Sequence, residues 1–166
     1  MKKLTKSELK KIKIGLPDIK RQLCCDGEFY KIVCVSVFDK WLSEEECEQI
    51  YTKDNAVIED WRKRLEKAIV ELYNLTDTYL WRNKRHGRIT FYKPSSIKHL
   101  LKVCDISNQT WRSGQRYDIL LPEYSAFYAE EWDWTNLILY KDPEKIKPLL
   151  DTLQKAGLHI LPNNEE

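Results

Sequence analysis

The segment SAFYAEEWDWTNLILY at residues 125–140 is the part of the chain that says most about its fold. Its two halves, residues 125–130 and 134–140, have the alternation and the aromatic content that are typical of strands. Only residues 131–133 separate them, and a connection this short joins antiparallel neighbours. The segment therefore predicts a β-hairpin within a sheet that is at least partly antiparallel.

A helix and a short strand are expected after this hairpin. Asp142 can cap a helix whose first residue is Pro143, and Gly157 can end it. A closing strand follows at residues 158–161. The apolar positions that this helix should turn toward the core are Ile146, Leu149, Leu150, Leu153 and Ala156.

The longest helix is expected in the N-terminal half. Between residues 54 and 73, apolar residues from Val57 onward recur at steps of three and four and form a stripe that should face the core. Trp61 and Leu65 at the centre of this stripe should be buried. Ser43 and Glu46 form a capping box for a short helix that ends near residue 51. The remaining predicted elements are basic helices at 7–23 broken at Gly15, a strand at 29–38 covered on both faces, a hairpin at 78–82 and 88–93, a helix that Ser95 or Ser96 caps and that carries Cys104, a polar loop at 105–116, and a strand at 117–121.

Composition places the chain among ordinary globular proteins. Its 166 residues are 42% hydrophobic and include six Trp and nine Tyr, which excludes a disordered or fibrous chain. No apolar run is long enough to span a membrane and the lysine-rich start does not resemble a signal peptide, so a cytoplasmic protein is expected. Because helices separate groups of strands that include antiparallel hairpins, the predicted fold is a single α+β domain over residues 1–166, with a mixed, mainly antiparallel sheet and helices packed against it.

Charge is distributed in four bands although the net charge is only +2. Residues 1–21 carry a net charge of +6 and residues 39–60 one of −6, while residues 81–116 carry +8 and residues 117–166 carry −6. A basic band can bind phosphates, but basic and acidic bands can also lie against each other and neutralise one another. The sequence leaves both arrangements open.

Cysteine and histidine spacing predicts neither a metal site nor a disulfide framework. We expect the cysteines to be reduced, and we predict no cofactor and no catalytic residue. His99 and His159 have apolar neighbours, which favours core or boundary histidines with one hydrogen bond each. The five cysteines are Cys24, Cys25, Cys34, Cys47 and Cys104.

The turn of the 125–140 hairpin is the first candidate site. Its carboxylates and large aromatics can dock into a basic cleft of a protein partner, hold a divalent cation or form an acid–base pair. The alternative is that one Trp packs inward while the acids are only solvated, and we expect Trp134 to be more buried than Trp132. The partner-binding candidates are Glu130, Glu131, Trp132, Asp133 and Trp134.

The basic tip of the 78–93 hairpin is the second candidate site. Arginine binds phosphates through two hydrogen bonds and aromatic faces stack on bases, so basic residues beside Trp81, Phe91 and Tyr92 are typical of a nucleic-acid surface. An exposed charged turn without a function is the alternative. The nucleic-acid-binding candidates are Arg82, Lys84, Arg85, His86, Arg88, Arg112 and Arg116, with His86 also able to supply acid–base chemistry.

Three functions are consistent with these features. The leading hypothesis is a non-catalytic cytoplasmic protein that binds a protein partner through residues 130–134, as an inhibitor of the toxin-immunity type would, because catalytic spacings are missing while Trp, Tyr and acidic groups are abundant. The second is a nucleic-acid-binding protein that uses residues 82–116, and the third is a small hydrolase with carboxylates at Glu130, Glu131 and Asp133. The sequence does not predict an oligomeric state.

Overall fold

The computed structural model describes residues 3–24, 29–50, 52–84, 88–106, 117–131 and 134–162. Within these ranges every predicted helix and strand is present, and a short 3-10 helix, η3 (Pro122–Tyr124), adds to them. The helices are α1 (Lys6–Gly15), α2 (Ile19–Cys24), α3 (Glu44–Ile50), α4 (Asn55–Leu75), α5 (Ile97–Cys104) and α6 (Pro143–Lys155). The strands are β1 (Lys31–Ser36), β2 (Leu80–Lys84), β3 (Arg88–Tyr92), β4 (Asp118–Leu121), β5 (Ala126–Glu130), β6 (Thr135–Tyr140) and β7 (His159–Leu161).

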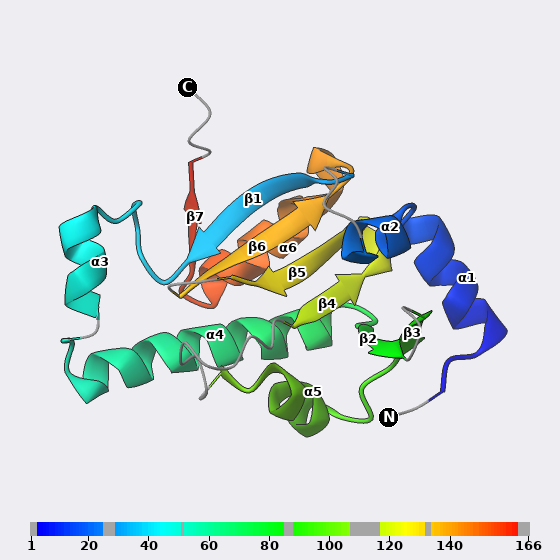
Figure 1. Ribbon diagram of the computed structural model, residues 1–166, viewed down its shortest axis with the longest axis horizontal. Helices are drawn as coiled ribbons and strands as arrows, with labels where there is room; N and C mark the ends of the chain where they lie inside the picture. The colour runs from blue at the N-terminus through cyan, green and yellow to red at the C-terminus, as the bar shows by residue number, and fades with distance from the viewer. Residues whose placement is uncertain are drawn as a thin grey trace.

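Five strands form one sheet in the order β4-β5-β6-β1-β7 (Figure 1). The β5–β6 hairpin at its centre has the predicted pairing, from Ala126 opposite Tyr140 to Glu130 opposite Asn136. The α+β class is confirmed. The mainly antiparallel sheet is confirmed as well, and the few parallel pairs that a mixed sheet would add are not found among the described residues, where β1 inserts between β6 and β7 and runs antiparallel to both.

One face of the sheet packs against α4, α5 and α6. The predicted stripe of α4 is buried there from Trp61 to Leu72, together with Val35 and Ile138 of the strands. We call this the first core. Helices α5 and α6 begin at the predicted caps Ser96 and Asp142, and Asp54 caps α4.

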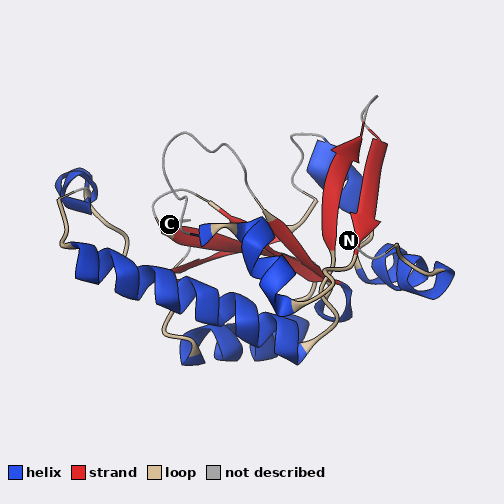
Figure 2. Cartoon of the chain, turned by 90° about the horizontal axis from the view of Figure 1, so that it is seen from below, coloured by secondary structure: helices blue, strands red, loops and turns tan. Residues whose placement is uncertain are grey.

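The opposite face is covered by α1, α2 and the β2–β3 hairpin, which stands beside the N-terminus in Figure 2. Ile12 of α1 and Phe91 of β3 bury their side chains against Phe127 and Leu139 of the sheet, and we call this the second core. The hairpin forms its own two-stranded sheet, and the backbone of Tyr79 just before it pairs with Leu120 of β4. The alternation along β5 and β6 therefore supplies two cores, one on each face.

Three predicted burials differ from the structure. Val57 is 39% exposed because the first turn of α4 extends past the end of the sheet (Figure 1). Strand β1 was expected to be covered on both faces, but Ile32 is 43% exposed and no described β1 residue belongs to the second core. His159 is exposed because it lies on the edge strand β7, whereas His99 is the expected boundary histidine, with its Nδ1 accepting from the backbone N–H of Ser95 at 3.1 Å.

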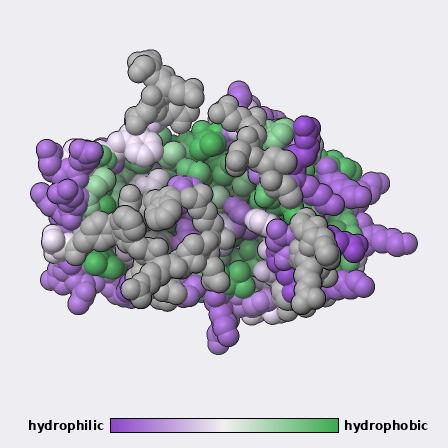
Figure 3. All heavy atoms as spheres, viewed as in Figure 1, coloured by the Kyte–Doolittle hydropathy of each residue, from purple (hydrophilic) through white to green (hydrophobic). Residues whose placement is uncertain are grey.

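The acidic band 39–60 and the basic residues of α1, α2 and the β2–β3 hairpin lie at opposite ends of the molecule (Figure 1). The acidic band 39–60 occupies the left end in Figure 1, around α3, whereas α1, α2 and the β2–β3 hairpin place basic residues at the right end. Figure 3 shows hydrophilic side chains gathered at both ends. Among the described residues, no ion pair joins band 39–60 to the basic bands, and its own pairs, such as Lys40–Glu46 and Arg64–Asp60, are local. Within the described ranges, the acidic band 39–60 is therefore not neutralised by contact with the basic bands.

Candidate functional site

We call residues 130–134 the acidic-aromatic turn. This segment connects β5 to β6 at the end of the sheet that lies toward α3 (Figure 1). Glu130 ends β5 and Glu131 follows it, and both are half-buried. Burial and then the charge of Glu131 raise the pKa of the Cys34 thiol. Burial and then the charge of Glu130 raise the pKa of Cys104 in the first core. Glu130 and Glu131 therefore lie close to different cysteines.

Trp134 holds the turn against the first core. Its ring meets Trp61 edge to face, with centroids 5.5 Å apart, and Trp61 in turn meets Phe38 at 5.0 Å. Its backbone has a φ of 63°, and its carbonyl accepts from the N–H of Val37 at 3.4 Å. We call Phe38, Trp61 and Trp134 the aromatic trio. Trp134 is half-buried, so its main role in the described structure is packing.

Two of the partner-binding candidates, Trp132 and Asp133, lie outside the described residues. The expected difference in burial between Trp132 and Trp134 therefore stays a prediction. What the structure does place is the base of the turn, with Glu130 and Glu131 on one side and Trp134 on the other.

The acidic end contains further groups that the sequence did not assign to a site. We define this end as residues 39–50, 52–60, 130–131 and 134. Trp41 is 38% exposed, and its indole N–H donates to the carbonyl of Pro162 at 2.7 Å, which fixes the ring. The predicted capping box begins α3, with the backbone N–H of Ser43 donating to Glu46 at 2.9 Å. An anchored, exposed indole therefore lies within a surface rich in carboxylates.

The β2–β3 hairpin exposes basic side chains, but two of its aromatic rings pack inward. Arg82 and Arg88 are exposed on β2 and β3. Trp81, however, donates its indole N–H to Asp118 at 2.6 Å, and Phe91 is buried in the second core. These two rings therefore do not offer free faces for stacking on bases. Of the other candidates, Lys84 lies opposite Arg88 in the hairpin with its side chain outside the described set, and Arg85, His86, Arg112 and Arg116 lie outside the described residues altogether.

A buried polar cluster lies in the first core beneath the β5–β6 hairpin. The side-chain amide N–H of Asn136 donates to the hydroxyl of Tyr128 and, at 3.5 Å, to that of Tyr117. All three residues are buried, and the Oδ1 atom of Asn136 has no hydrogen-bond partner among the described residues. Burial raises the pKa of both tyrosines, so their hydroxyls remain protonated at neutral pH. The sequence pattern predicts only that Tyr117, Tyr128 and Asn136 are strand residues.

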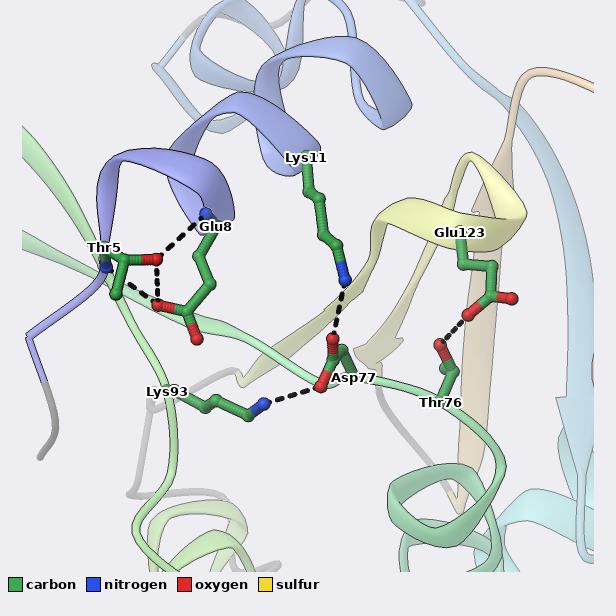
Figure 4. Close-up of polar contacts among 7 residues, drawn as sticks. All are labelled: Thr5, Glu8, Lys11, Thr76, Asp77, Lys93 and Glu123. Atoms are coloured by element: carbon green, nitrogen blue, oxygen red, sulfur yellow. Dashed lines mark hydrogen bonds and ion pairs between the residues drawn. The ribbon is translucent and has the colours of Figure 1, made fainter.

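Asp77 is a second group that the sequence did not single out. Figure 4 shows it between Lys11 of α1 and Lys93 after β3, at 3.1 Å and 2.5 Å. The hydrogen bonds from Lys93 and then Lys11 lower the pKa of Asp77. Asp77 therefore ties α1 to the β2–β3 hairpin. Lys11 lies 66 residues away in the chain, so no local pattern could have revealed this tie.

The described part of the chain contains no group of three or more side chains that could hold a metal ion. Its helices also include none with the length and apolarity that crossing a bilayer requires. Comparisons of this chain with protein-family models, with curated proteins and with solved structures find no match.

Proposed function

We propose that this protein is a non-catalytic cytoplasmic protein that binds and inhibits a cationic protein partner, in the manner of a toxin-immunity protein, through its acidic end. One observation carries the proposal: the acidic-aromatic turn and the acidic band 39–60 belong to the same end of the molecule. The aromatic trio connects them, because Trp134 packs on Trp61 of α4 and Phe38 precedes α3.

This arrangement suits recognition of a basic surface. Carboxylates spread over α3, the start of α4 and the turn would attract such a surface at long range, which mainly speeds association. Anchored aromatic rings are the groups that most often hold an interface at short range. Trp41 is exposed and fixed by its hydrogen bond to Pro162, and Trp132, which lies outside the described residues, is the second aromatic candidate from the sequence.

The test measures binding to the protein that the wild-type chain captures from its own cell lysate. Surface plasmon resonance should show slower association for Glu131→Ala with Asp133→Ala, and faster dissociation for Trp132→Ala and Trp41→Ala. The matched control is Glu66→Ala with Glu144→Ala, which removes equal charge from exposed positions on α4 and α6. Affinities of all variants within about twofold of wild type would refute the proposal.

A nucleic-acid-binding function through the basic end is the second candidate. It is favoured because α1, α2 and the β2–β3 hairpin bring two separate basic stretches to the same end (Figure 1). Since Trp81 and Phe91 pack inward, such binding would rest on phosphate contacts and depend strongly on salt.

Fluorescence anisotropy with single- and double-stranded oligonucleotides at low salt tests this candidate. Arg82→Ala with Arg88→Ala should weaken binding, and Lys63→Ala with Lys155→Ala, on α4 and α6, should change it less. Because both arginines are exposed, the first variant should also keep its stability within about 0.5 kcal/mol of wild type. An absence of wild-type binding at low salt would eliminate this function.

A further inference from the structure

A groove of about 580 Å³ lies where α1 crosses the end of the sheet, away from the acidic end. Its walls come from α1, from the connection between α4 and β2, from η3 and from α6. The volume falls within the range of about 300 to 1,000 Å³ that is usual for small-molecule sites. Its principal polar lining residues are Lys10, Lys11, Thr76, Asp77, Glu123 and Lys145.

The frame of the groove is fixed by close packing. A side chain at Gly15 of α1 would place its Cβ 2.1 Å from the carbonyl oxygen of Pro122, so α1 can rest on η3 only because residue 15 is glycine. Asp77 is held at the same time by Lys11 and Lys93. Figure 4 shows these contacts beside the Thr76 hydroxyl, which donates to Glu123 at 2.6 Å. Asp77, Thr76 and Glu123 are therefore positioned before any ligand arrives.

Charge within the groove is unevenly neutralised. Lys11 forms an ion pair with Asp77, and Lys93 forms a second ion pair with the same carboxylate. Lys10 of α1 and Lys145 of α6 also line the groove, and neither belongs to an ion pair among the described residues. The carboxylate of Glu123 also lines the groove, and it accepts a hydrogen bond from the hydroxyl of Thr76. Ile14, which is 70% exposed, adds an apolar side chain to the lining.

We propose that this groove binds a small organic anion that also carries a hydroxyl or amino group. Lys10 and Lys145 would hold the oxyanion, since ammonium groups bind phosphate and carboxylate through charge-assisted hydrogen bonds. Glu123 would accept from the hydroxyl or amino group of the same molecule, and Ile14 would contact its carbon skeleton. A phosphate ester and a hydroxy acid share this chemistry. The site is independent of the partner-binding function proposed above.

The test uses the full chain with three probes: glycerol 3-phosphate, malate and inorganic phosphate. Amide chemical shifts should change for α1, Thr76, Asp77 and Glu123 when glycerol 3-phosphate or malate is added, and whichever binds more tightly identifies the oxyanion as phosphate or carboxylate. Lys10→Ala with Lys145→Ala should weaken this binding at least about tenfold. The matched control, Lys13→Ala with Lys155→Ala, lies on the same two helices outside the groove and should stay within about twofold.

Glu123→Ala separates the two halves of the proposal. This substitution should weaken the binding of glycerol 3-phosphate, because it removes the carboxylate that accepts from the hydroxyl of the ligand. Inorganic phosphate should bind as well or better, because the negative charge of Glu123 no longer repels it. The proposal is overturned if neither organic probe shifts the groove amides, or if the control pair loses as much affinity as the groove pair. Equal gains for both phosphates in Glu123→Ala would overturn the role of Glu123.

Discussion

The two faces of the central sheet are covered by different means. The first core lies under α4, α5 and α6, and the largest contribution comes from a single helix of 21 residues. The second core lies under α1 and α2, of 10 and 6 residues, and a two-stranded hairpin. The first face is therefore stabilised mainly by one long apolar stripe. The second is assembled from short pieces, with Asp77 connecting two of them.

The largest expected effect is on the first face. Leu65 is fully buried at the centre of α4, so Leu65→Ala should lower the free energy of unfolding by about 2 to 5 kcal/mol through lost burial and a cavity. Denaturant melts measure this loss. A change below about 0.5 kcal/mol would show that α4 does not form the main core.

Ile12→Ala is the matched deletion on the second face. Ile12 is also fully buried, but α1 is short and lies at the periphery, so part of the cost should appear as local opening. Hydrogen exchange should then lose protection first in α1 and α2, whereas Leu65→Ala should lower it across the sheet. Uniform loss in both variants would mean that the two faces unfold as one unit.

Buried tyrosines beneath both faces should make the stability depend on alkaline pH. Burial raises the pKa of Tyr117 and Tyr128 above the usual value near 10, so these groups keep their protons in the folded chain when the unfolded chain has lost them. Stability is then complete below about pH 10 and falls as pH rises, by up to about 1.4 kcal/mol per pH unit for each tyrosine.

Unfolding curves at rising pH test this dependence, and Tyr128→Phe should reduce the slope because it removes one titrating group. Tyr79, beneath the second face, has a pKa raised to about 12 by burial and then by Asp77 and Glu8, so it contributes in the same direction. Stability that stays constant from pH 9 to 12 would contradict the burial of these hydroxyls.

The fold could be predicted where information is local. The capping residues Ser43, Ser96 and Asp142, the stripe around Leu65 and the 125–140 hairpin each lie within one continuous segment. The insertion of β1 between β6 and β7 could not be predicted, because pairing between segments that are distant in the sequence leaves no trace in either one. The sequence could therefore predict a mainly antiparallel sheet, but not that every described strand pair is antiparallel.

The candidate sites were less accessible to sequence reasoning. Residue types alone suggested that Trp81 and Phe91 face outward beside the arginines, but the hairpin lies on a sheet face and its rings fill the second core. Conversely, Asp77 looked like an ordinary loop residue and acquires its role only from Lys11 and Lys93. Spatial convergence from separate segments decides both cases.

The smallest expected effect tests the tie on the second face. Asp77→Asn removes the charge that holds Lys11 and Lys93 together, and the free energy of unfolding at neutral pH should fall by about 1 kcal/mol, since both partners are exposed or half-buried and screened by water. The lysines lower the pKa of Asp77, so its stabilising charge is present above the usual value near 4 and disappears as pH falls below it. The difference between wild type and Asp77→Asn should therefore shrink in acid. Glu144→Gln, which breaks an exposed pair with Lys147 within one helix, is the control and should cost less than about 0.5 kcal/mol. If both variants lose the same small amount of free energy of unfolding, and neither loss depends on pH, then only Ile12 and its apolar neighbours hold α1 in place. The contrast between the two faces would then rest on helix length.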